Sequence, residues 1–114
     1  MLWISNYNIK EGRMREFQKF VKDNENALRE HAPKGWKFQG VYCYVLGFGP
    51  YHVAELWEMS DYADFDTFRN HNDPTWLKLM EQGMEFTTNE PAVAWLLREA
   101  ADTKITEPKP KKKP

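Results

Sequence analysis

The sequence predicts a single α+β domain, and three observations support that fold class. The 114 residues are 41% hydrophobic and 15% aromatic, which is enough apolar material for one packed core and too much for a disordered chain. Apolar residues recur with a helical period in two regions. Around those regions lie aromatic and β-branched segments bounded by glycine and proline, which are typical of strands.

The first two elements are a strand and a long helix. Residues 2–9 are aromatic and β-branched, and Gly12 follows them, so we expect a strand there. Residues 13–31 carry apolar side chains spaced three, four and seven positions apart, namely Met14, Phe17, Val21 and Leu28. This spacing places them on one face and predicts an amphipathic helix.

The next two elements form a predicted hairpin. Residues 36–48, with Gly40 in their interior, and residues 51–59 are rich in aromatic and β-branched side chains. A turn containing glycine and proline at residues 47–50 joins them, so we expect two long neighbouring strands.

A second helical region with a break in it follows. Ser60 and Asp61 have side chains that accept hydrogen bonds from the exposed N–H groups of a helix start. Asp73-Pro74 is a sharper start signal, because proline at the first helical position loses no hydrogen bond. We therefore expect a break near residues 71–72. Residues 91–99 are expected to form the last strand, although alanine and leucine there also favour helix.

The order of these elements predicts the ferredoxin-like β-α-β-β-α-β arrangement over residues 1–102. This fold is a four-stranded antiparallel sheet with both helical regions on one face. Alternation along the strands puts apolar side chains on both sheet faces. Since the helices cover only one face, we expect a homodimer with the sheets face to face, forming a dimeric α/β barrel. The sequence does not decide which face the helices cover.

Charge is divided between the domain and a tail. Residues 1–102 hold 11 basic and 16 acidic residues, whereas residues 103–114 hold five lysines and one glutamate. The Lys/Pro-rich tail is expected to be disordered and solvated. Residues 51–97 contain only Arg69 and Lys78 against nine acidic groups, so no nucleic-acid partner is expected.

The sequence also disfavours a membrane protein, a secreted protein and a protein with its own metal site. No run of about 18 apolar residues and no signal peptide are present. The single cysteine, Cys43, cannot form an internal disulfide, which fits a cytoplasmic location. Three scattered histidines do not provide a protein-built metal site.

His71 is the candidate catalytic residue. A histidine ring exchanges protons near neutral pH, and a helix break can place its side chain in a cavity. The alternative is structural, because a polar side chain in residues 70–73 can satisfy backbone groups at the break or face water. Both interpretations stay open.

Glu55 and Trp57 share one face of the third strand, and a carboxylate beside indole rings is suited to orient a polar substrate. The alternative is a glutamate paired with a base at the dimer interface, because this face also carries surplus aromatic residues. Trp76, on the apolar face of the restarted helix, is a further candidate substrate contact.

Asn6 and Asn8 share one side of the first strand. If that side meets the helices, their amides are suited to hold a substrate carbonyl or hydroxyl. Equally, Asn8 ends the strand and bonds to turn backbone. Tyr44 is expected to line a pocket or an interface.

Four segments carry a family resemblance, and they are residues 55–58 (Glu-Leu-Trp-Glu), Asp61, residues 68–71 (Phe-Arg-Asn-His) and residues 73–76 (Asp-Pro-Thr-Trp). On the basis of these segments, roughly residues 1–100 resemble the dimeric α/β-barrel superfamily and its antibiotic-biosynthesis-monooxygenase-like domains. The resemblance implies cofactor-free oxygenation of a small aromatic or polycyclic substrate, in which His71 assists deprotonation and Asn6 or Asn8 binds the oxyanion.

Other branches of the superfamily imply two alternatives. One is a non-catalytic dimer that binds haem or another flat apolar ligand, with His71 as a lone axial ligand. The other is a stress-responsive or structural barrel without turnover. The helix after Asp73 offers Trp76 but no histidine, which departs from the haem-degrading pattern. The fold alone does not choose among these functions.

Overall fold

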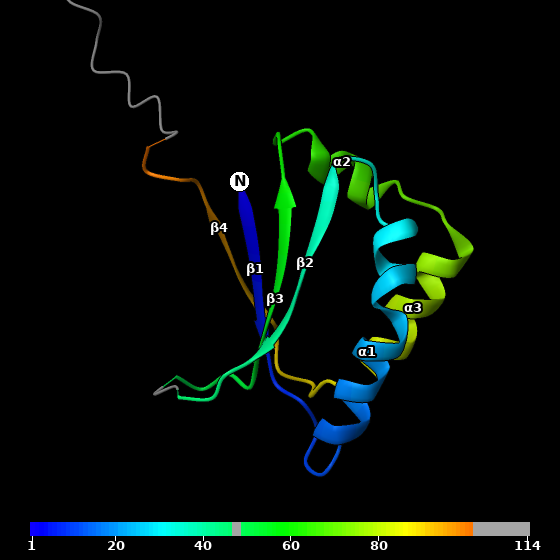
Figure 1. Cartoon of the computed structure of the whole chain (residues 1–114), viewed down its shortest axis with the longest axis vertical. Coiled ribbons are helices and arrows are strands. Elements are labelled where there is room, and N and C mark those ends of the chain that lie inside the picture. Colours follow the sequence, from blue (N-terminus) through cyan, green and yellow to red (C-terminus); the bar gives the residue numbers. More distant parts are fainter. Residues whose placement is uncertain (47–48, 102–114) are drawn as a thin grey trace, which may run out of the picture.

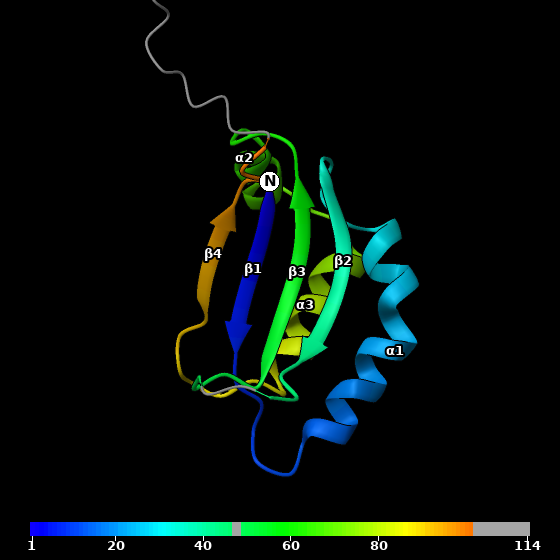
Figure 2. The same cartoon turned by 60° about the vertical axis from the view of Figure 1, so that its left-hand side comes forward.

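A computed structural model describes residues 1–46 and 49–101, and it confirms the expected order of elements. The elements are β1 (Leu2–Tyr7), α1 (Met14–Glu30), β2 (Trp36–Cys43), β3 (Val53–Met59), α2 (Asp64–Arg69), α3 (Pro74–Met84) and β4 (Val93–Leu97). The strands pair antiparallel in the order β2-β3-β1-β4. All three helices lie on one side of the sheet (Figures 1 and 2), which is the ferredoxin-like arrangement.

The hairpin strands are shorter than the sequence predicts. β2 ends at Cys43 and β3 begins at Val53. The register shifts between Phe38 and Gly40, and Gly40 adopts φ 139°, which glycine tolerates. Val45 and Leu46 are 92% and 91% exposed, so this apolar run packs on no second layer. The expected turn at residues 47–50 falls partly outside the described residues.

The break in the second helical region is confirmed. α2 ends at Arg69, and α3 begins at Pro74 with Asp73 as its N-cap, whose side chain accepts from the Trp76 N–H at 2.9 Å. The start of α2 lies further along the chain than Ser60 and Asp61 predict. The Asp64 carboxylate instead reaches back and accepts from both of their N–H groups, at 2.9 and 3.0 Å.

The helices cover the sheet face that carries Trp3, Tyr7, Glu55 and Trp57. The main core cluster lies on this side and combines residues of the sheet, α1 and α3: Leu28, Trp36, Phe38, Trp57, Met59, Trp76 and Leu79. Trp57 is only 4% exposed in the single chain. The interpretation of Glu55 as a dimer-interface residue is therefore wrong, because helices already cover its face.

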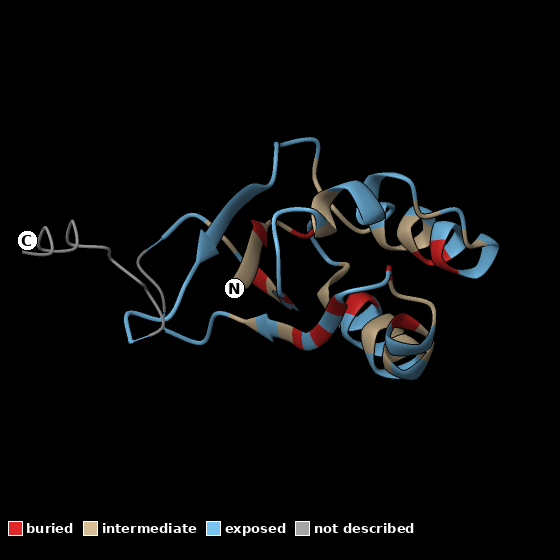
Figure 3. Cartoon of the chain, turned by 90° about the horizontal axis from the view of Figure 1, so that it is seen from above, coloured by how far each residue is buried: buried red, intermediate tan, exposed pale blue. Residues whose placement is uncertain are grey.

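No helix covers the opposite sheet face, and β4 is exposed along its length (Figure 3). It presents Leu2 and Ile4 from β1, together with exposed side chains that include Tyr42, Val93, Trp95 and Leu97. Trp95 is 51% exposed. The expectation of two apolar faces is thus confirmed, and the uncovered one, here called the open face, is the face available to a partner.

Two further observations concern the limits of the domain. The predicted tail at residues 103–114 lies outside the described residues, as does Asp102 at the predicted domain boundary. Within the described part of the chain, no helix has both the length and the apolar character needed to cross a bilayer.

Candidate functional site

Glu55 is the central polar residue between the sheet and the helices. Its two carboxylate oxygens accept from the Tyr7 hydroxyl at 3.0 Å and from the Trp57 indole N–H at 2.9 Å. Tyr7 reaches it from β1, where Ser5 is paired with Glu55 and Tyr7 lies two residues further along the same face. Among the described residues, no lysine, arginine or histidine forms an ion pair with Glu55. Both carboxylate oxygens of Glu55 thus act as hydrogen-bond acceptors.

Tyr7 is held as a hydrogen-bond donor. Burial raises the pKa of the Tyr7 hydroxyl far above its usual range, and the charge of Glu55 and their hydrogen bond raise it further. The phenol therefore keeps its proton and directs it at the carboxylate.

A cavity of about 570 Å³, here called the large cavity, opens beside Glu55. The sheet contributes Tyr7, Val41 and Glu55 to its wall, while α1 and α3 contribute mainly apolar side chains: Phe20, Val21, Leu28, Leu79 and Met80. The Thr88 hydroxyl also belongs to a lining residue, and it is the one buried side-chain polar atom without a hydrogen-bond partner among the described residues. Lys10, Asn89 and Glu90 also line the cavity, and a mainly apolar chamber with some polar groups is typical of a small-molecule site.

A second cavity of about 190 Å³ adjoins the first, because Glu55 and Met80 line both. Apart from Glu55, Met80 and Ser5, its walls are aromatic: Trp3, Trp36, Trp57, Phe65, Phe68 and Trp76. We call it the aromatic pocket. α2 supplies Phe65 and Phe68, and α3 supplies Trp76.

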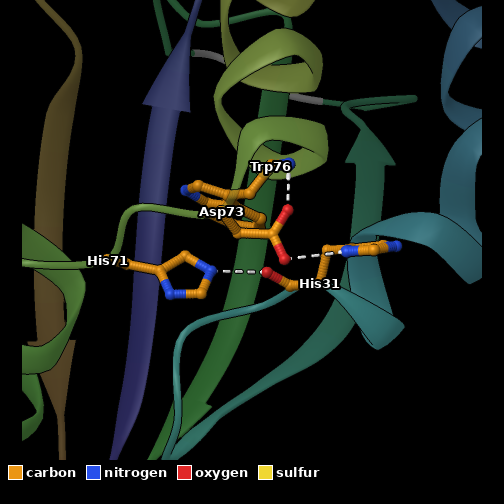
Figure 4. A network of polar contacts seen from close by, with 4 residues as sticks. All are labelled: His31, His71, Asp73 and Trp76. Carbon is orange, nitrogen blue, oxygen red and sulfur yellow. Dashed lines mark hydrogen bonds and ion pairs between the residues drawn. The ribbon is translucent and has the colours of Figure 1, made fainter.

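His71 lies at the edge of this region and makes a structural contact (Figure 4). Its Nε2 donates to the backbone carbonyl of His31 at 2.6 Å, and its ring packs edge-on against Trp76 with centroids 5.7 Å apart. His71 lines neither the large cavity nor the aromatic pocket. The structure therefore favours the interpretation in which His71 satisfies backbone at the helix break.

The same break is tied to the end of α1. His31 Nδ1 lies 2.9 Å from Asp73 Oδ2, and the other carboxylate oxygen of Asp73 caps α3 (Figure 4). The hydrogen bond from His31, followed by the one from the Trp76 N–H, lowers the pKa of Asp73. This network fixes α3 over the large cavity.

Asn6, Asn8 and Tyr44 lie away from Glu55. Asn6 is fully buried, accepts from the Tyr44 hydroxyl and donates to the Val93 carbonyl at 3.2 Å. Asn8 accepts from the His52 N–H at 2.9 Å and donates to Glu90 at 3.1 Å. These side chains connect β1 to the hairpin and to β4, which favours the turn-bonding interpretation of Asn8.

The predicted site residues thus form two groups. Glu55, Trp57 and Trp76 come together beneath the helices, with His71 beside them, whereas Asn6 shares the open side of the sheet with Leu2 and Ile4. The structure does not bring Asn6 or Asn8 to His71, because neighbouring side chains along a strand point to opposite sides.

Sequence reasoning missed Tyr7 as the partner of Glu55, and it also missed Phe65, Phe68 and Thr88. The alternation in β1 places Tyr7 on the same face as Trp3, but the contact with Glu55 depends on the β1–β3 register. That register depends on pairing across 48 residues, which no local pattern reveals.

The sequence matches no protein-family model and no curated protein. Solved structures do resemble the chain. A NIPSNAP domain protein from Burkholderia xenovorans is 20% identical, with a TM-score of 0.65 and coverage of 87% of this chain and 94% of that one. A dabb family protein with a ferredoxin-like fold from Mesorhizobium loti is 15% identical, with a TM-score of 0.59 and coverage of 86% and 96%.

A third structure, a protein from Agrobacterium tumefaciens, is 20% identical, with a TM-score of 0.67 and coverage of 93% of this chain and 100% of that one. These similarities establish the ferredoxin-like α+β fold. At such low identity they say nothing further about activity.

Proposed function

We propose that the chain binds a small aromatic or polycyclic compound in the large cavity, with a hydroxyl group of that compound donating to Glu55. The observation that carries this proposal is the carboxylate itself, which lies on the wall of a mainly apolar chamber without an ion-pair partner in the described residues. A half-buried carboxylate such as Glu55 gains from each added donor. The unpartnered Thr88 hydroxyl offers a second polar contact.

The reaction that this arrangement supports best is cofactor-free oxygenation of the bound phenol. Glu55 takes the phenolic proton, and the electron-rich anion then reacts with O₂ at the ring carbon opposite its oxygen. One oxygen atom enters the product as a quinone carbonyl, while the other leaves as water with the two displaced hydrogens. With 1-naphthol and O₂ the balanced products are 1,4-naphthoquinone and water. In this proposal Glu55 replaces His71 as the proton acceptor.

Calorimetric titration with 1-naphthol tests binding, and 1-methoxynaphthalene serves as the ligand that lacks the donor. We expect Glu55→Gln to weaken 1-naphthol binding about tenfold, because a hydrogen bond to a charged acceptor is lost. Glu58→Gln, on the exposed side of the same strand, is the matched control. Equal affinity of Glu55→Gln and the wild type, or equal binding of both naphthalenes, contradicts the proposal.

Oxygen uptake with 1-naphthol tests turnover separately. We expect Glu55→Gln to abolish uptake and His71→Ala to retain it. Uptake that is lost in His71→Ala but retained in Glu55→Gln would restore the assignment made from the sequence.

Haem binding through His71 receives no support from these residues. The His71 Nε2 atom is occupied by the His31 carbonyl, and His71 does not line the large cavity. The described residues also contain no cluster of three or more potential metal ligands.

The proposal includes a cytoplasmic homodimer formed through the open face. Exposed Tyr42, Val93, Trp95 and Leu97 support it, because an apolar sheet face of this kind favours a second copy. A stress-responsive or structural dimer is the function that remains if neither binding nor turnover is detected.

A further inference from the structure

The aromatic pocket contains the Glu55 carboxylate and six aromatic rings. Among the described residues, no basic side chain forms an ion pair with Glu55 and no arginine lies over one of these rings. We propose that it binds a tertiary or quaternary alkylammonium group. This goes beyond the proposed function, because it concerns a different pocket and a ligand of opposite charge to a phenolate.

The first argument is the charge of Glu55. Its described partners, the Tyr7 hydroxyl and the Trp57 indole, are neutral donors. Both groups hold the carboxylate in place without neutralising it. A carboxylate in apolar surroundings attracts a cation strongly, because the low local dielectric weakens screening.

The second argument is the state of the rings. Cations bind over the faces of Trp, Tyr and Phe within about 6 Å of the ring centre. The arginine–ring contacts among the described residues are on Phe38, Tyr62 and Phe86, none of which lines the aromatic pocket. No protein cation therefore occupies the six pocket rings in the described part of the chain.

The third argument is the arrangement of those rings. Trp36 meets Trp3 at 78° and Trp57 at 74°, while Trp57 meets Trp76 at 77°. Rings at such steep angles to one another form walls facing several directions. A spherical quaternary ammonium head has no preferred hydrogen-bond direction and suits such walls, and a tertiary head adds one N–H that can point at the Glu55 carboxylate.

Size and access agree with this occupant. A cavity of about 190 Å³ has room for a small apolar group, since a cavity of about 150 Å³ already holds a benzene molecule, and a trimethylammonium head is of this size class. Trp36, Trp57 and Trp76 are at most 7% exposed, whereas Phe68 is 44% exposed. The pocket thus has a buried end at the tryptophans and an open side at Phe68.

The walls are also fixed before any ligand binds. The Trp36 indole donates to the Asp64 carbonyl at 2.7 Å, and the Thr67 hydroxyl lies 3.1 Å from the Lys34 carbonyl. Gly35, with φ +90°, lets the Asp64 side chain approach where a Cβ would lie 2.5 Å from it. These contacts hold α2 against the start of β2, which lowers the cost of ordering the pocket on binding.

Calorimetric titration with choline and its uncharged isostere 3,3-dimethylbutan-1-ol tests the proposal on the full chain. We expect choline to bind at least about tenfold more tightly than the alcohol, because only choline gains the cation–ring and carboxylate attraction. Glu55→Gln should weaken choline binding about tenfold and leave the alcohol unchanged.

Phe68→Leu tests the rings, with Tyr62→Leu as the matched exposed control outside the pocket. We expect Phe68→Leu alone to weaken choline binding several-fold. Equal binding of choline and the alcohol overturns the proposal, as does the absence of choline binding. Choline affinity that survives both Glu55→Gln and Phe68→Leu also overturns it, since the cation then binds elsewhere. Titration with 1-naphthol reports separately on the large cavity.

Discussion

Tyr7 shows how one side chain ties the stability of the domain to its candidate site. Its hydroxyl donates to Glu55, and its pKa is raised by burial, by the charge of Glu55 and by that hydrogen bond. In the unfolded chain the phenol ionises near pH 10. The folded state therefore binds the proton more tightly, and the stabilisation is present below pH 10 and is lost as the pH rises above it.

We expect Tyr7→Phe to lower the free energy of unfolding near neutral pH by about 1.5–3 kcal/mol, because a hydrogen bond to a charged group is lost. Above pH 10 the stability of the wild type should fall more steeply than that of Tyr7→Phe. Urea unfolding between pH 7 and 11 measures both effects, with Tyr62→Phe as the exposed control. Parallel pH profiles for the wild type and Tyr7→Phe would contradict the contact.

At this scale the sequence predicted only part of the site. The shared face of Glu55 and Trp57 follows from strand alternation, and it is confirmed by their hydrogen bond. The partner Tyr7 and the structural contact of His71 depend on pairing between distant segments. Local pattern does not determine such pairing.

The break between α2 and α3 determines how the helical layer sits on the large cavity. Asp73 caps α3 and pairs with His31, and both contacts lower its pKa. The folded state thus favours the charged carboxylate. The resulting stabilisation is present above the unfolded pKa of an aspartate and is lost as the pH falls through the lowered folded value.

We expect Asp73→Ala to lower the melting temperature at pH 7, because it removes both the cap and the contact with His31. Asp73→Asn should lower it less, because asparagine still caps the helix. The difference between the wild type and Asp73→Asn should vanish in acid, where Asp73 is protonated. Thermal melts from pH 2 to 7 check this, and a difference that does not change with pH would contradict the charge effect.

End signals in the sequence located the start of α3 better than that of α2, which begins at Asp64 and not at Ser60 or Asp61. Asp73-Pro74 located the start of α3 because capping and proline act locally. The apolar run through Val45 and Leu46 suggested a longer strand, but these side chains have no surface to pack on. Strand length depends on that packing more than on local preference.

The whole molecule is a two-layer sheet and helix structure with one face left open. The sequence predicted the order of its elements and the placement of the helices on one face, because connections between strands and helices follow general rules. It did not predict which face the helices cover. Both faces are apolar, so alternation alone gives no preference.

We expect Trp95→Glu to convert the proposed dimer into a monomer, because it places a charge among apolar side chains of the open face. Leu77→Glu, on a half-exposed position of α3, is the matched control and should leave the assembly unchanged. Size-exclusion chromatography with light scattering measures both. A monomeric wild type, or a dimer that Leu77→Glu disrupts and Trp95→Glu does not, would contradict assembly through the sheet.

The central claim is that Glu55 directs a ligand into the chamber beneath the helices, and a crystal structure of the protein grown with 1-naphthol tests it most directly. The account predicts ligand density in the large cavity, with the naphthol oxygen within hydrogen-bond distance of the Glu55 carboxylate. Density confined to the open face, or a ligand whose oxygen contacts His71 instead of Glu55, would contradict it.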